Sequence, residues 1–129
     1  MKSVLIVDDD NDLLKLYRQV FLNASFSVDD SLTIPAAEEL IKKKKYDVIL
    51  LDILFPDTDI FSTIRLIRNK NSLNAKTPIL VLTNLDSGEK TQKALEYGAN
   101  ECLFKATQTP STVFKAAMRL AGNNHPQKT

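Results

Sequence analysis

Short runs of consecutive hydrophobic residues alternate along this chain with longer stretches in which hydrophobic residues recur at helical spacing. Three of the runs, Val4–Val7, Val48–Leu51 and Pro78–Thr83, are rich in branched side chains. Such runs are typical of strands that are covered on both faces of a parallel sheet. Two less regular segments, Ser25–Leu32 and Glu101–Lys105, are predicted to be further short strands.

The stretch after each predicted strand favours a helix. The first helix is expected to end near Asn23. The second should begin at Thr33, with Pro35 in its first turn, and the fourth should begin at Ser87, which would cap it. Gly98 is expected to end the fourth helix in a left-handed conformation. The predicted helices comprise residues 13–23, 33–45, 60–69, 87–98 and 110–120. Strict alternation of strand and helix predicts an α/β fold, one doubly wound parallel sheet with helices on both faces.

Length and charge limit the possible organisation. The chain has 129 residues and a mass of 14.5 kDa, which fits one domain with its own core. We expect this domain to span residues 1–121 and the polar residues 122–129 to form a disordered tail. The formal net charge is only +1, so no global field draws the protein to nucleic acid or to a membrane.

Cysteine and histidine are too scarce for several kinds of site. Cys102 is the single cysteine and His125 the single histidine, which argues against a zinc site built from these residues and against a histidine-based triad. Any metal ion would therefore be held by oxygen ligands. No apolar run approaches the roughly 20 residues that span a bilayer, and none is typical of a signal peptide, so we expect a cytoplasmic protein.

Polar residues stand where the predicted strands end. Asp8 and Asp9 follow the first strand, Asp52 follows the third, Thr83 ends the fourth and Lys105 ends the fifth. In parallel sheets the ligand site lies beyond the carboxyl ends of the strands, so these groups should meet in one cleft. Close carboxylates need a counter-charge, which Mg²⁺ would supply, because it prefers oxygen ligands.

Each of these residues alone has a simpler interpretation. Asp52 could be a helix cap or a turn residue. Thr83 could be an ordinary hydroxyl at a strand end, and Lys105 a surface lysine whose stem packs on apolar neighbours. The interpretation as a site depends on their occurring together.

Taken together, Val7-Asp8-Asp9, Leu51-Asp52 with Pro56, Val81-Leu82-Thr83 and Phe104-Lys105 resemble the motifs of one family. The chain resembles the receiver domain of bacterial response regulators, the CheY-like module that a sensor histidine kinase phosphorylates in two-component signalling. The resemblance covers nearly all of Lys2–Leu120. It implies a flavodoxin-like, five-stranded sheet of order 2-1-3-4-5 with five helices.

The resemblance also implies a role for each residue of the site. Asp52 would accept the phosphoryl group. Lys105 and Thr83 would contact phosphoryl oxygens. The metal ligands implied for Mg²⁺ are Asp8, Asp9, Asp52 and the backbone carbonyl of Leu54. Such a domain is not an enzyme, apart from promoting its own phosphorylation and dephosphorylation.

The implied partners are proteins. They are a sensor histidine kinase or a phosphotransfer protein, and a downstream target that the sequence does not identify. We expect no binding of nucleic acid or membrane by this chain, and a monomer or a weak dimer. A different class of function remains open, in which the chain is a pseudo-receiver that acts as a scaffold without phosphorylation. The sequence is also compatible with one part of a longer protein.

The sequence departs from the family pattern on both sides of Lys105. Ala106 replaces a proline whose peptide bond is cis in the family, and a cis bond to a non-proline residue costs about 2.5–4 kcal/mol, so we predict a trans bond and a reshaped loop. Cys102 stands where the family commonly has an aromatic switch residue. It is either a redox-sensitive thiol or a plain packing residue, and we favour the second.

Other departures lie near the predicted phosphorylation site. Ile60 follows Asp59 where the family usually has a glycine, so that loop should take a different path or run directly into the third helix. Leu54 and Leu85 occupy positions that, in the family, influence how water reaches the acyl phosphate. Because both are apolar, we expect them to exclude water and to prolong the phosphorylated state.

Overall fold

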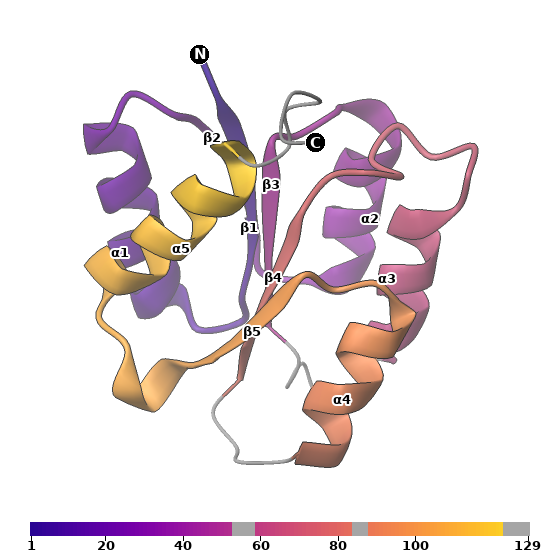
Figure 1. Ribbon diagram of the computed structural model, residues 1–129. Coiled ribbons are helices and arrows are strands. Elements are labelled where there is room, and N and C mark those ends of the chain that lie inside the picture. Colours follow the sequence, from indigo (N-terminus) through magenta and orange to yellow (C-terminus); the bar gives the residue numbers. More distant parts are fainter. Residues whose placement is uncertain (53–58, 84–87, 123–129) are drawn as a thin grey trace.

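The computed structural model describes residues 1–52, 59–83 and 88–122 of the chain. Parallel strands in the order β2-β1-β3-β4-β5 form its central sheet (Figure 1). This arrangement confirms the predicted fold class and strand order. The strands are β1 (Ser3–Val7), β2 (Ser27–Ser31), β3 (Val48–Asp52), β4 (Ile79–Thr83) and β5 (Glu101–Phe104).

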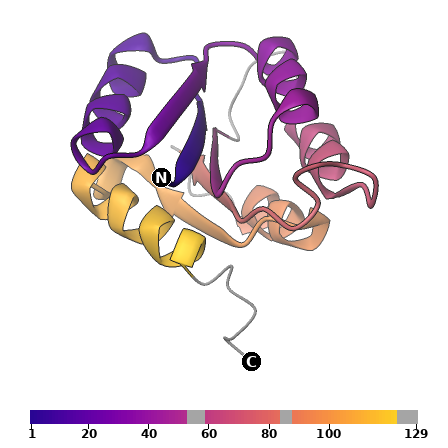
Figure 2. The same ribbon diagram turned by 90° about the horizontal axis from the view of Figure 1, so that it is seen from above.

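Helices cover both faces of the sheet and make a three-layered molecule (Figure 2). One face carries α1 (Asn11–Asn23) and α5 (Pro110–Gly122). The other carries α2 (Ile34–Lys43), α3 (Ile60–Arg68) and α4 (Gly88–Tyr97). A hydrophobic cluster lies on each side, because β1, β3 and β4 place alternate apolar side chains on opposite faces.

Local capping explains where the helices begin. The side chain of Asp10 accepts hydrogen bonds from the first turn of α1, Thr33 does the same for α2, and Asp59 does so for α3. Thr33 confirms the predicted start of the second helix. Ser87, predicted to cap the fourth, lies outside the described residues. Gly98 follows α4 with a φ of +126°, so the predicted turn at a positive φ is confirmed.

Several element ends differ from the prediction by one or two residues; α2, for example, ends at Lys43 and not at Lys45. α5 continues to Gly122, two residues beyond the predicted end at Leu120, because Ala121 is buried on the sheet and extends the apolar face of the helix. Residues 123–129, the remainder of the predicted tail, lie outside the described residues. β5 ends at Phe104, and Lys105 begins a short 3₁₀ turn, η1 (Lys105–Thr107). Among the described helices, none has the length and apolarity to cross a bilayer.

Candidate functional site at the carboxyl edge of the sheet

The register of the strands brings three predicted site residues to one edge of the sheet. Asp8 follows β1 directly, Asp52 is the last residue of β3, and Thr83 is the last residue of β4. Val7 pairs with Leu51, so Asp8 and Asp52 leave neighbouring strands at the same level. Asp52 pairs in turn with Leu82, and Thr83 lies one residue further along β4. The structure therefore brings these residues together, as the sequence predicted.

Three carboxylates gather at this edge. One oxygen from each of Asp8, Asp9 and Asp52 lies within 4.8 Å of the others. Asp8 and Asp52 are buried, whereas Asp9 is exposed. A close set of carboxylate oxygens that is open on one side suits a hard divalent cation, which keeps several of its water ligands. The donor set thus fits Mg²⁺, the ion predicted from the sequence.

Lys105 supplies the positive charge that the acidic residues need. Its Nζ atom lies 2.7 Å from Oδ2 of Asp8 and 3.0 Å from Oδ2 of Asp52. The lysine side chain is only 6% exposed, so these ion pairs are shielded from solvent. Buried charges persist only when they are paired. Lys105 is therefore part of the site and not a surface lysine.

Burial and pairing act in opposite directions on the ionisation of this pair. Burial raises the pKa of Asp8, and the ion pair with Lys105 offsets only part of that increase. For Lys105, burial lowers the pKa, but the bonds to Asp8 and Asp52 outweigh it and the net direction is upward. Lys105 therefore stays protonated at neutral pH and holds two carboxylates close together.

The three consecutive acids after β1 have different roles. Oδ1 of Asp8 accepts a hydrogen bond from the backbone N–H of Asp10 at 2.9 Å, which orients its other oxygen toward Lys105. The backbone N–H of Asp8 donates to the carbonyl of Ser31 at the end of β2. Asp10 caps α1 and lies outside the cluster. Only Asp8 and Asp9 of this run therefore contribute to the site.

The remaining predicted residues are less fully described. Thr83 is 3% exposed and stands next to the strand of Asp52. Leu54, whose carbonyl was expected to bind the metal, lies outside the described residues, as do Pro56 and Leu85.

A family model described as the response regulator receiver domain matches residues 4–117 of the chain. The chain belongs to this family. Among curated proteins, the transcriptional regulatory protein RstA of Escherichia coli is 33% identical over 129 residues, which is 100% of this chain and 52% of RstA. CusR of the same species is 34% identical over 103 residues, 80% of this chain and 44% of CusR. The chain thus spans about half the length of these relatives.

Solved structures agree with this assignment. The chemotaxis response regulator CheY4 of Vibrio cholerae superposes with a TM-score of 0.83 at 29% identity, over 93% of this chain and 98% of that one. The receiver domain of the Francisella response regulator 1452 gives a TM-score of 0.84 at 25% identity, over 97% of this chain and 100% of that one. The likeness to both therefore extends over nearly the whole receiver domain.

The loop after β5 of this receiver domain is built without the family's proline. The Lys105–Ala106 peptide bond is trans, as predicted. The chain then turns through η1, and the N–H of Gln108 donates to the carbonyl of Lys105 at 3.3 Å. Lys105 thus reaches Asp8 and Asp52 from a short helical turn.

Cys102 is a packing residue of this receiver domain. It is half-buried against the hydrophobic cluster beneath α2, α3 and α4, with Sγ 4.0 Å from the carbonyl oxygen of Thr91. Burial, together with the neighbouring charge of Glu101, raises the thiol pKa to about 11. Because the thiolate is the reactive form, this environment favours the packing role over a redox role.

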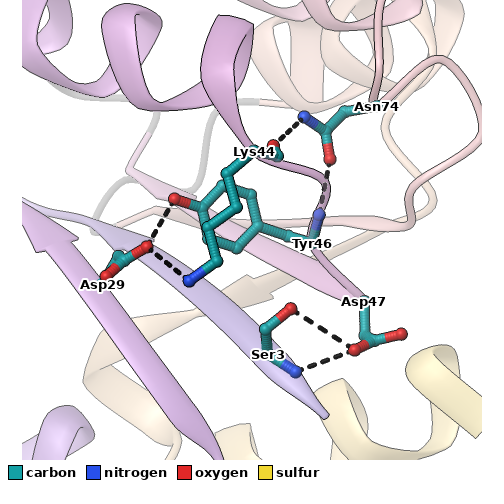
Figure 3. Close-up of polar contacts among 6 residues, drawn as sticks. All are labelled: Ser3, Asp29, Lys44, Tyr46, Asp47 and Asn74. Atoms are coloured by element: carbon teal, nitrogen blue, oxygen red, sulfur yellow. Dashed lines mark hydrogen bonds and ion pairs between the residues drawn. The ribbon is translucent and has the colours of Figure 1, made fainter.

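A second polar cluster, which sequence reasoning missed, lies toward the other end of the sheet (Figure 3). The carboxylate of Asp29 accepts hydrogen bonds from the hydroxyl of Tyr46 at 2.7 Å and from Nζ of Lys44 at 3.1 Å. Lys44 directly follows α2, and its ammonium group reaches Asp29 because β2 lies beside the end of that helix. The adjacent acids Asp29 and Asp30 in the predicted second strand were the available signal.

Asn74 completes this cluster from the connection after α3. Its side-chain oxygen accepts from the N–H of Tyr46 at 2.8 Å, and its amide group donates to the carbonyl of Lys44 at 2.8 Å (Figure 3). The amide group also donates to the carbonyl of Ile41 at 2.9 Å. The side chain is fully buried. It therefore has a structural role, because it fastens the connection after α3 to the end of α2.

Proposed function

We propose that this receiver domain accepts a phosphoryl group on Asp52 from a sensor histidine kinase or a phosphotransfer protein. In that reaction the phosphorus–nitrogen bond of the donor's phosphohistidine breaks, and a phosphorus–oxygen bond to the Asp52 carboxylate forms. The modified domain then signals by altered binding to a downstream protein. The chain promotes its own phosphorylation and dephosphorylation and acts on no external substrate.

One observation carries this proposal, which is that Asp52 and Lys105 form a buried ion pair beside Asp8 and Asp9. A buried carboxylate that only stabilised the fold would need one counter-charge. Here two further carboxylates crowd the same edge, and this excess of negative charge is costly unless a cation binds. Phosphoryl transfer requires an aligned nucleophile and neutralisation of the phosphoryl oxygens, and this arrangement supplies both.

The residues divide these tasks. Asp8, Asp9, Asp52 and the carbonyl of Leu54 would hold Mg²⁺, which neutralises charge on the phosphoryl group when it is bound. Lys105, kept protonated, would exchange its contact with Asp52 for a phosphoryl oxygen, and the Thr83 hydroxyl would donate to another. Loss of the original Lys105 contact would change the η1 turn and the end of β4, and with them the surface that partners bind.

A pseudo-receiver that works as a scaffold is the alternative. The trans turn at Ala106 and the small side chain of Cys102 favour it, because both lie on the usual route from the phosphorylation site to the partner surface. The complete acidic site favours phosphorylation. The relatives RstA and CusR are named transcriptional regulatory proteins, and we propose that this domain receives the signal. With a formal net charge of only +1, we propose that it makes no direct contact with nucleic acid.

The test is to incubate the protein with Mg²⁺ and acetyl phosphate and to measure the intact mass. We expect one phosphoryl adduct that is absent without Mg²⁺ and absent in Asp52→Asn. Asp12→Asn is the matched control, since Asp12 is an exposed acid of α1. A wild type that never takes up phosphate would support the scaffold. An adduct that survives Asp52→Asn would mean that another carboxylate is the acceptor.

The lifetime of the adduct tests the proposed water exclusion by Leu54 and Leu85. We expect Leu54→Asn and Leu85→Glu to speed the loss of phosphate, because a polar side chain can position water near the acyl phosphate. Equal decay rates in the wild type and both variants would refute this role without affecting the assignment of Asp52.

A further inference from the structure

A groove lies between α2, α3 and the chain that follows α3. It has a volume of about 670 Å³, within the range of ligand-binding clefts. Since both helices run antiparallel to the strands, their carboxyl ends and the following connection lie at the edge of the sheet opposite Asp52 (Figure 1). The groove is therefore separate from the acidic site.

The lining of this groove combines apolar side chains with positive charge. Ile41, Leu66 and Leu73 are the apolar lining residues, and Leu73, from the connection after α3, is 52% exposed. Lys42 and Arg65 are the charged lining residues. The uncharged polar lining residues are serines and asparagines, so none of the lining residues carries a carboxylate. The adjoining segments add positive charge through three further exposed lysines, Lys43, Lys45 and Lys70.

The partners of the two lining cations leave their charge available. Lys42 lies 3.8 Å from Glu39 on the same helix, but both side chains are more than half exposed, and such a pair contributes little. The guanidinium of Arg65, which lines the groove, also lies 5.7 Å from the ring centroid of Tyr97 at the end of α4, a contact that leaves its charge unneutralised. Within the described part of the chain, no carboxylate forms an ion pair with Arg65. The groove thus presents an excess of positive charge beside apolar surface.

Hydrogen bonds hold the wall of the groove in place. Asn74 fastens the connection after α3 to the carbonyls of Ile41 and Lys44. Arg68, at the end of α3, donates to the carbonyls of Ala75 and Thr77 in the same connection, at 3.2 and 2.7 Å. A wall fixed in this way loses little conformational entropy when a ligand binds.

We propose that this groove binds an acidic peptide segment of a partner protein. An aliphatic side chain of the segment would pack on Leu66 and Leu73, and its carboxylates would face Lys42 and Arg65. The charge complementarity favours an acidic occupant. None of the lining residues is aromatic, so the groove lacks the stacking surface with which single-stranded nucleic acids are usually bound. This inference does not depend on phosphorylation of Asp52.

The test uses a short labelled peptide in which leucine alternates with aspartate and glutamate, and a matched peptide with lysine in place of the acids. Binding is followed by fluorescence anisotropy, and the contact surface by amide chemical-shift changes. We expect only the acidic peptide to bind. Its binding should shift the amide signals around Arg65 and Leu73 and should weaken as the salt concentration rises. Binding of both peptides alike, or of neither, would overturn the proposal.

Variants locate the interaction. Arg65→Glu and Leu73→Ser should each weaken binding about tenfold, a loss of about 1.4 kcal/mol, because one reverses a charge and the other removes apolar contact. Lys115→Glu changes the net charge as Arg65→Glu does, but it lies on α5, on the opposite face, and should leave binding unchanged. Circular dichroism verifies that each variant is folded. Equal weakening by Lys115→Glu, or tighter binding of a single-stranded oligonucleotide at the same residues, would contradict the proposal.

Discussion

The Nζ atom of Lys105 lies 2.7 Å from Asp8 and 3.0 Å from Asp52, so one buried ammonium bridges two carboxylates from neighbouring strands. Lys105 follows β5 at the edge of the sheet, whereas Asp8 follows β1 near the other side. The contact spans β3 and β4, which separate β1 from β5. It therefore ties the ends of non-adjacent strands together as well as balancing charge.

Replacing Lys105 by methionine should destabilise the protein in the absence of divalent cations. The change leaves Asp8 and Asp52 without their shared cation, and breaking a buried ion pair by removing one partner typically costs about 3–5 kcal/mol. Urea unfolding in EDTA measures the free energy of unfolding. Mg²⁺ should restore part of the loss by supplying positive charge at the same carboxylates.

The pH dependence of Lys105→Met gives a second readout. Burial already raises the pKa of Asp8, and without Lys105 the pKa should rise further. A carboxyl group whose pKa is higher in the folded state binds protons more tightly there, so the variant should regain stability as the pH falls. Lys115→Met, at an exposed position, is the control. A Lys105→Met protein as stable as the wild type in EDTA would contradict the importance of the bridge.

Asn74→Ala should destabilise the fold without reaching the acidic site. The substitution leaves the N–H of Tyr46 and the carbonyl of Ile41 without their partner in a buried place. Each unsatisfied buried group costs about 1–3 kcal/mol, so we expect a total loss of several kcal/mol in urea unfolding. Asn71→Ala is a matched control in the same connection, because Asn71 is exposed. Equal losses in both variants would show that the buried hydrogen bonds of Asn74 contribute nothing particular.

The contrast between Lys105 and Asn74 shows what could be predicted from the sequence. Uninterrupted apolar runs locate β1, β3 and β4, and parallel strands must end at one edge, so the meeting of Asp8, Asp52 and Lys105 followed from the pattern. Asn74 stands in a polar connection and bonds to Tyr46, which is 28 residues away. No local periodicity reports such a contact, because it depends on how the layers pack.

Cys102 should react slowly with thiol reagents at neutral pH. Burial and Glu101 raise its pKa from 9.0 to about 11, which lowers the thiolate fraction at pH 7 by about a hundredfold. The rate of labelling by a disulfide reagent should increase about tenfold per pH unit toward pH 10. Since Cys102 is the single cysteine, the signal has one source, and the unfolded protein gives the reference rate. Rapid labelling of the native protein at pH 7 would instead favour a redox role.

Gly98→Ala should destabilise the protein for two reasons, and both concern the Cβ atom that the substitution adds. Gly98 has a φ of +126°, which L-residues rarely adopt, and an added Cβ would lie 2.8 Å from Cγ of Arg68. Arg68 cannot move aside freely, because its guanidinium group holds the carbonyls of Gly98 and Thr77 at 3.0 and 2.7 Å. We expect a loss of more than about 1 kcal/mol in the free energy of unfolding, since the backbone strain alone costs that much. Gly88→Ala is the matched control, because an added Cβ there meets nothing within 4 Å, and it should be neutral or slightly stabilising. A Gly98→Ala protein that unfolds at the same urea concentration as Gly88→Ala would show that neither the strain nor the contact with Arg68 limits this turn.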